Sequence, residues 1–130
     1  MPILNVKLSA KPSAAMSRRI ADILTELTAR ILHKDPTVTA IAIDYVAPEH
    51  WFAGGRSLAE QGLNSVYFDI KITDETNTRA EKARYIAEAY EAFSNLLGPL
   101  HEESYIYVQD VRATAYGFGG KTQEWRAHHR

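Results

Sequence analysis

The chain has 130 residues, a formal net charge of -1 at pH 7 and no cysteine. This length suits one domain with its own hydrophobic core, and the lack of cysteine excludes disulfide frameworks and thiolate metal sites. Acidic and basic residues are mixed along the chain without a basic stripe, so nucleic acid is not an expected partner. No apolar run approaches the ~18 residues of a membrane span, and no signal-peptide pattern begins the chain. We therefore expect a soluble, cytoplasmic protein.

The first half of the chain predicts a strand, a helix and a second strand in that order. Ile3 to Leu8 form a short apolar run typical of a strand. Apolar residues then recur at three- and four-residue spacing from Met16 to Ile31, which is typical of a helix with one buried face. Ser13 is its expected N-cap, and Asp35-Pro36 marks its end because proline cannot continue a helix. Val38 to Val46 follow as a β-rich run.

The second half repeats this order. A strand is predicted from Val66 to Ile72, and a helix over the periodic apolar residues from Ala83 to Leu97. The segment Thr78-Arg79-Ala80-Glu81 ahead of that helix has the form of a capping box. Gly98-Pro99 ends the helix, and Ser104 to Val111 form the next β-rich run.

Each half then closes on an aromatic residue and a glycine pair, in Trp51 to Gly55 and in Tyr116 to Gly120. We interpret residues 1–130 as one domain made of two β-α-β-hairpin repeats, about 1–62 and 63–130. Right-handed crossovers in two such units predict an α+β fold, in which two helices cover one face of a four-stranded sheet. We expect the uncovered face to be apolar and buried by assembly into a closed ring. The residues assigned to that face are Ile41, Ile43, Tyr45, Ile106 and Val108.

Pro2 is the most informative single residue, because loss of Met1 would expose a secondary amine. A terminal amine titrates near pH ~8 in water. Burial beside cations would lower its pKa, since desolvation and like charge both disfavour the protonated form. Such an amine is suited to general-base catalysis near neutral pH. On residue type alone, the simpler reading is that Pro2 only begins an edge strand, where its missing N–H is tolerated.

These features together resemble the tautomerase superfamily, over the whole chain. The most specific are Met1-Pro2-Ile3 and the segment His50-Trp51-Phe52-Ala53-Gly54-Gly55, which is similar to the His-Phe-Gly-Ile-Gly-Gly of 4-oxalocrotonate tautomerase. The double-length format resembles 5-carboxymethyl-2-hydroxymuconate isomerase, malonate semialdehyde decarboxylase and the cis-3-chloroacrylic acid dehalogenases. The resemblance implies a homotrimer with a small-molecule substrate, no cofactor and one catalytic proline per chain. Val66 stands where the second repeat would carry its proline.

The chain departs from the family at the residues that bind substrate carboxylates. In 4-oxalocrotonate tautomerase two arginines hold them, and those positions correspond here to Lys11 or Pro12 and to Ala40. The arginine pair of the dehalogenases corresponds to Asp74 and Asn77. The acidic residue of the decarboxylase corresponds to a position near Thr39. These departures predict a preference for substrates with one carboxylate or none.

The resemblance also implies a pocket around Pro2 lined by aromatic and hydroxyl-bearing side chains. Tyr107 is similar to a tyrosine that assists catalysis in the cis dehalogenases, and its hydroxyl could polarise a carbonyl or return a proton. The catalytic candidates are Pro2 and Tyr107, and the substrate-binding candidates are Trp51, Tyr105, Tyr116, Lys71 and Arg79. For every one of these except Pro2, the alternative is ordinary aromatic packing or a solvated surface charge.

No metal site is expected, since the five histidines lack the spacing of a ligand set. By resemblance, Pro2 would remove a proton α to a carbonyl and return it to a carbon further along the substrate. Tyr107 or a backbone N–H would steady the dienolate oxygen. A related cofactor-free decarboxylase, hydratase or dehalogenase is one alternative. The other is a non-catalytic trimeric ligand-binding module, if Met1 is retained and the Pro2 nitrogen stays an amide.

Overall fold

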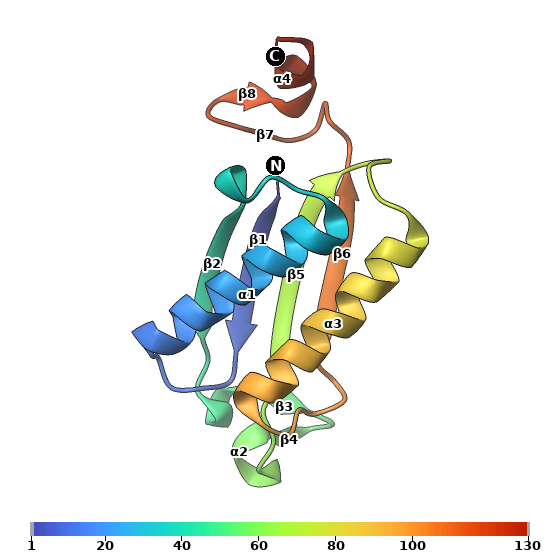
Figure 1. The fold of residues 1–130 in the computed structure, drawn as a ribbon. Helices are drawn as coiled ribbons and strands as arrows, with labels where there is room; N and C mark the ends of the chain where they lie inside the picture. The colour runs from blue at the N-terminus through green and yellow to red at the C-terminus, as the bar shows by residue number, and fades with distance from the viewer. Residues whose placement is uncertain (1, 130) are drawn as a thin grey trace.

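The computed structural model describes residues 2–129 and arranges them in two layers (Figure 1). Two long helices lie side by side on one face of a four-stranded sheet. The helices are α1 (Ala14–Leu32) and α3 (Arg79–Leu97), and the strands are β1 (Ile3–Leu8), β2 (Ala40–Tyr45), β5 (Val66–Thr73) and β6 (Tyr105–Val111). The strand order is β2-β1-β5-β6, with β1 parallel to β2, β5 parallel to β6 and β1 antiparallel to β5. The predicted fold class is confirmed.

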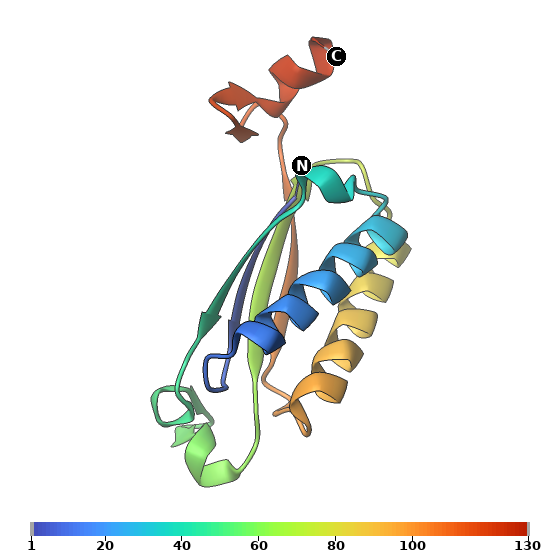
Figure 2. The same cartoon turned by 60° about the vertical axis from the view of Figure 1, so that its left-hand side comes forward.

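The remaining elements are short and lie at the two ends of the sheet. They are η1 (Pro36–Val38), η2 (Pro48–His50), the hairpin of β3 (Phe52–Ala53) and β4 (Arg56–Ser57), α2 (Leu58–Gln61), the hairpin of β7 (Gly117–Phe118) and β8 (Lys121–Thr122), and α4 (Gln123–His128). Residues 112–129, which contain the second hairpin and α4, are called the C-terminal arm below. Figures 1 and 2 show this arm projecting beyond the end of the sheet where β1 begins. Among the described residues, no helix is long and apolar enough to cross a lipid bilayer.

The ends of the two long helices follow the sequence signals closely. The Ser13 hydroxyl accepts a hydrogen bond from the Met16 N–H at 3.1 Å, as expected of an N-cap. Thr78 and Glu81 form the complete capping box at the start of α3. The first helix ends at Leu32, earlier than its proline predicts, because His33 adopts a left-handed conformation with φ 59°.

The core lies between the sheet and the helices. Phe68 of β5 is at its centre, with ring centroids 6.1 Å from Tyr85 and 5.8 Å from Phe93. The Tyr85 hydroxyl shares a buried hydrogen bond of 2.8 Å with the Thr28 hydroxyl, which ties α3 to α1. Burial raises the pKa of Tyr85, so the phenol stays protonated. This contact supplies the polar partner that a buried tyrosine needs.

Replacing Tyr85 by phenylalanine should lower the free energy of unfolding by about 1–3 kcal/mol, because it leaves the buried Thr28 hydroxyl without a partner. Urea denaturation measures this change. Tyr90→Phe on the same helix is the control and should change stability by less than about 0.5 kcal/mol. Equal losses in the two variants would contradict the importance of the Thr28 contact.

The expectation of an apolar open face is wrong. Ile41, Ile43, Tyr45, Ile106 and Val108 all pack against the core on the helix side. The register explains this, because Leu4 of the core face lies opposite Ile41 in β2 and side chains alternate along each strand. The face that no helix covers carries Ile3, Asn5, Lys7, Ala40, Ala42, Asp44, Tyr67, Asp69, Lys71, Thr73, Tyr105, Tyr107, Gln109 and Val111. This open face is therefore polar and aromatic.

Candidate active site

Pro2 is buried and directly precedes β1, and its carbonyl accepts a hydrogen bond from the Ala40 N–H at 3.1 Å. Because β1 is parallel to β2 and antiparallel to β5, the starts of β1 and β2 meet the ends of β5 and β6. We call this edge of the sheet the Pro2 end. Lys71 lies there directly opposite Ile3, and Thr73 closes β5 two residues later.

Lys71 is at the Pro2 end as the sequence predicts, but its charge is already matched. Its Nζ lies 2.7 Å from Oδ1 of Asp69 on the same strand. The Asp69 side chain is 7% exposed and that of Lys71 is 44% exposed. A substrate carboxylate would therefore compete with a buried carboxylate for this ammonium, which makes Lys71 a poor anchor for a second negative charge.

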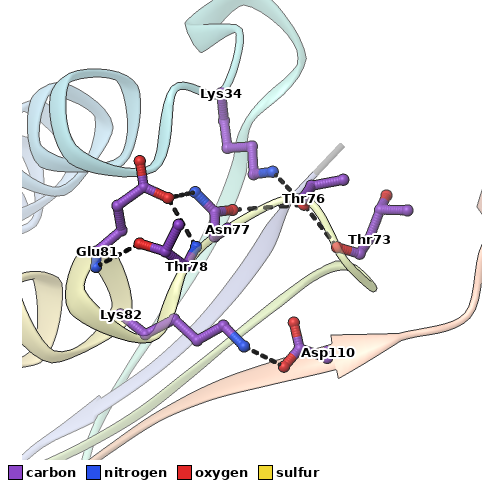
Figure 3. Close-up of polar contacts among 8 residues, drawn as sticks. All are labelled: Lys34, Thr73, Thr76, Asn77, Thr78, Glu81, Lys82 and Asp110. Carbon is purple, nitrogen blue, oxygen red and sulfur yellow. Dashed lines mark hydrogen bonds and ion pairs between the residues drawn. The ribbon is translucent and has the colours of Figure 1, made fainter.

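Lys34 is a cation that the sequence analysis missed. Its Nζ donates to the Thr76 hydroxyl at 2.8 Å, and Thr76 in turn donates to the Thr73 carbonyl at 2.6 Å (Figure 3). Within residues 2–129 no carboxylate lies within ion-pair distance of this ammonium. Desolvation lowers the pKa of Lys34, although Glu81 and Asp110 oppose the shift from further away. Lys34 thus presents an unmatched, half-buried charge at the Pro2 end.

A signal for Lys34 existed in the sequence. A β-α-β crossover brings the end of its helix back to the edge where its first strand begins. A lysine placed between the first helix and the second strand must therefore lie at the same edge as Pro2.

The loop between β5 and α3 is held rigidly beside this lysine. Asn77 donates from its amide to the Leu32 carbonyl at 2.9 Å and to Glu81 at 3.3 Å. Lys82 pairs with Asp110 at 2.5 Å beneath the loop (Figure 3). Asn77 is thus committed to the fold. Arg79 lies in the first turn of α3 with its side chain exposed.

Of the predicted aromatic residues, Tyr116 reaches this region, whereas Tyr107 lies nearer the middle of the sheet. Tyr116 of the C-terminal arm shares a hydrogen bond with the Thr73 hydroxyl, so the arm is tied to the Pro2 end. Tyr107 lies on the open face opposite Asp69, with its ring centroid 5.7 Å from that of Tyr67. Its side chain is exposed in the single chain.

Two other aromatic candidates do not lie near Pro2 within one chain. Trp51 follows the carboxyl end of β2, at the opposite end of the sheet. Tyr105 begins β6 opposite Tyr67, and its hydroxyl donates to Glu103, which raises the pKa of Tyr105. Each of these residues holds, within its own repeat, the position that matching the repeats assigned to it. Neither lies at the Pro2 end of its own chain, because β1 and β5 are antiparallel and the strands of the two repeats therefore begin at opposite ends of the sheet.

Two hollows in the surface of the described residues lie away from Pro2. One of about 360 Å³ lies within the C-terminal arm and is lined in part by Tyr116 and Lys121. Another of about 520 Å³ lies at the opposite end, beside Lys11 and Tyr45. Within residues 2–129 no three His, Asp or Glu side chains gather in a way that could hold a metal ion.

Comparison with known proteins agrees with this arrangement. Residues 2–61, which form the first β-α-β unit, match the family model described as tautomerase enzyme. This match covers the first repeat and makes that half of the chain similar to the tautomerase family. No curated protein matches the sequence.

Solved structures extend the likeness in fold to the whole chain. Native fused 4-OT has a TM-score of 0.78 at 24% identity, over 98% of this chain and 99% of its own. A fused 4-OT wild type symmetric trimer has a TM-score of 0.79 at 16% identity, over 94% and 96%. FG41 malonate semialdehyde decarboxylase inhibited by 3-bromopropiolate has a TM-score of 0.74 at 17% identity, over 98% and 97%. Both halves therefore share the fold of these enzymes.

Proposed function

We propose that this protein is a cofactor-independent tautomerase that uses the amine of Pro2, after removal of Met1, as its general base. The observation that carries the proposal is the position of Pro2, which is buried at the start of β1 in a tautomerase fold. Lys34, whose charge is unmatched, lies at the same end of the sheet. This cation and burial both favour the neutral amine that a base must be.

The proposed reaction is a keto-enol proton transfer on a small 2-oxo or 2-hydroxy acid. The neutral Pro2 amine removes a proton from the enol hydroxyl or from the α-carbon. In the first case the electron pair stays on the hydroxyl oxygen, and in the second it moves onto the carbonyl oxygen. A donor such as Tyr107 or Lys71 stabilises the resulting dienolate oxygen. The Pro2 ammonium then returns the proton to carbon, which restores the free amine.

Lys34 is the proposed anchor for the single substrate carboxylate. Its ammonium is half-buried and bonded to a neutral hydroxyl, so an arriving carboxylate gains a charge-assisted hydrogen bond without displacing an ion pair. Ala40 offers no second cation on β2. The assay that tests the function is ketonisation of phenylenolpyruvate, a monocarboxylate enol, together with the intact mass of the native protein. Retained Met1 or no ketonisation would contradict it.

We further propose that the protein acts as a homotrimer, as one similar structure, a fused 4-OT symmetric trimer, does. The open face is uncovered, and the C-terminal arm projects away from its own chain. A second copy can complete both features. Sedimentation equilibrium at micromolar concentration should give three chains per particle. A fully active monomer would contradict this assembly.

A further inference from the structure

The open face carries one carboxylate that the proposed reaction leaves without a role. Asp69 lies in the middle of β5, opposite Asn5 of β1 and Tyr107 of β6. Its side chain is almost fully buried on a face that no helix covers, although its partner Lys71 is largely exposed. Burying a carboxylate is unfavourable unless a specific partner compensates for the lost water. The sequence analysis did not select Asp69.

We propose that Asp69 is a positioning residue, which fixes the Lys71 ammonium beside Ile3 and balances its charge at the Pro2 end. This inference rests on the function proposed above. An ammonium has three N–H donors, and Asp69 accepts one of them at 2.7 Å. Within residues 2–129 the other two have no hydrogen-bond partner. They remain free to donate to an oxygen that gains negative charge beside Pro2.

Charge balance is the second part of this role. Pro2 must be neutral to accept a proton, so its pKa depends on every charge nearby. An unpaired Lys71 would lower the pKa of the Pro2 amine, whereas an unpaired Asp69 would raise it. As an ion pair the two side chains largely cancel. The pair therefore supplies local donors without altering the protonation of the base.

Other charged and titratable groups also face the Pro2 end or the same sheet face, and of these only Lys7 is changed in the test, as a control. Those of the open face are Lys7, Asp44, Tyr67, Tyr105 and Tyr107. Further groups lie in the loops, in the arm, and on the helix side of the sheet in α3 and β6. They are Lys34, Asp35, Glu81, Lys82, Asp110, Arg112 and Tyr116.

The test is direct titration of the Pro2 amine by nitrogen-15 NMR in mature protein labelled at proline, beside the pH profile of kcat/KM. Asp69→Asn should lower the Pro2 pKa and move the acidic limb of the profile to lower pH. Lys71→Gln should do the opposite. Each shift should be roughly 0.3–1 unit, as expected for the loss of one nearby, partly solvated charge. The double variant Asp69→Asn with Lys71→Gln should return close to the wild-type pKa.

Two further variants distinguish an effect of the charge at these positions from a general effect on folding. Asp69→Glu retains the charge and should leave the Pro2 pKa near its wild-type value. Lys7→Gln, further along β1 on the same face, should shift it less than Lys71→Gln does. Single variants that both move the pKa in one direction, or that leave it unmoved, would overturn the role of Asp69. A Pro2 nitrogen that does not titrate at all would overturn the proposed function instead.

Discussion

Replacing Pro2 by alanine in protein that has lost Met1 should lower kcat/KM for phenylenolpyruvate by about 10²–10⁴-fold, which is the usual contribution of a positioned general base. The pyrrolidine ring fixes the direction of the nitrogen lone pair, whereas the primary amine of alanine rotates freely. A stronger version of the test adds one residue ahead of Pro2 that cannot be removed. The nitrogen then becomes an amide without a usable lone pair, and the loss should be at least as large.

Pro12→Ala is the matched control, because Pro12 is exposed in the loop after β1, at the opposite end of the sheet. It should leave kcat/KM within about twofold of the wild type, since it touches neither the base nor the Lys34 region. Full activity in the extended protein would assign the proton transfer to another group. Equal losses in Pro2→Ala and Pro12→Ala would point to a general effect on folding.

Local sequence signals predicted the four main strands and the two long helices of this chain. Periodicity and capping residues such as Ser13 and Thr78 depend on neighbours a few positions away, so a single sequence contains them. The doubling of the β-α-β unit then restricted the topology to one sheet with both helices on one side.

The sequence did not show which side chains of each strand face the helices. The second strand of each unit alternates apolar and polar residues, and either set can face the helices. Ile41 and Ile106 face the core because β1 and β5 fix the register, and that pairing is a long-range contact. The open face accordingly became polar, with Asp69 and Lys71 at its centre.

The same limit explains why some candidate residues lie away from Pro2 within one chain. Matching the two repeats suggested that Trp51 and Tyr116 are equivalent, which is correct within a repeat. It could not show that antiparallel pairing of the repeats leaves only the second hairpin at the Pro2 end. Lys34 was missed for a different reason, because the arginine positions of the family correspond to Lys11 or Pro12 and to Ala40.

Replacing Lys34 by glutamine should lower kcat/KM for phenylenolpyruvate by roughly 10- to 150-fold, mainly through KM. A lost charge-assisted hydrogen bond costs about 1.5–3 kcal/mol, and each ~1.4 kcal/mol is a factor of ten. Lys82→Gln is the nearby control, because that ammonium is already paired with Asp110. It should have little effect on KM.

The pH dependence gives an independent check on Lys34. Only the protonated ammonium binds a carboxylate, and desolvation lowers the pKa of Lys34 below its ordinary value. Binding in the wild type should therefore weaken as pH rises through that lowered pKa, and this alkaline limb should be absent in Lys34→Gln. Because β2 carries Ala40 in place of a cation, only one carboxylate of a dicarboxylate such as 2-hydroxymuconate can bind Lys34, and the other has no cationic partner. A dicarboxylate should therefore be the poorer substrate. If it is instead preferred, and Lys34→Gln leaves that preference intact, an exposed arginine such as Arg79 holds the carboxylate and Lys34 has a structural role.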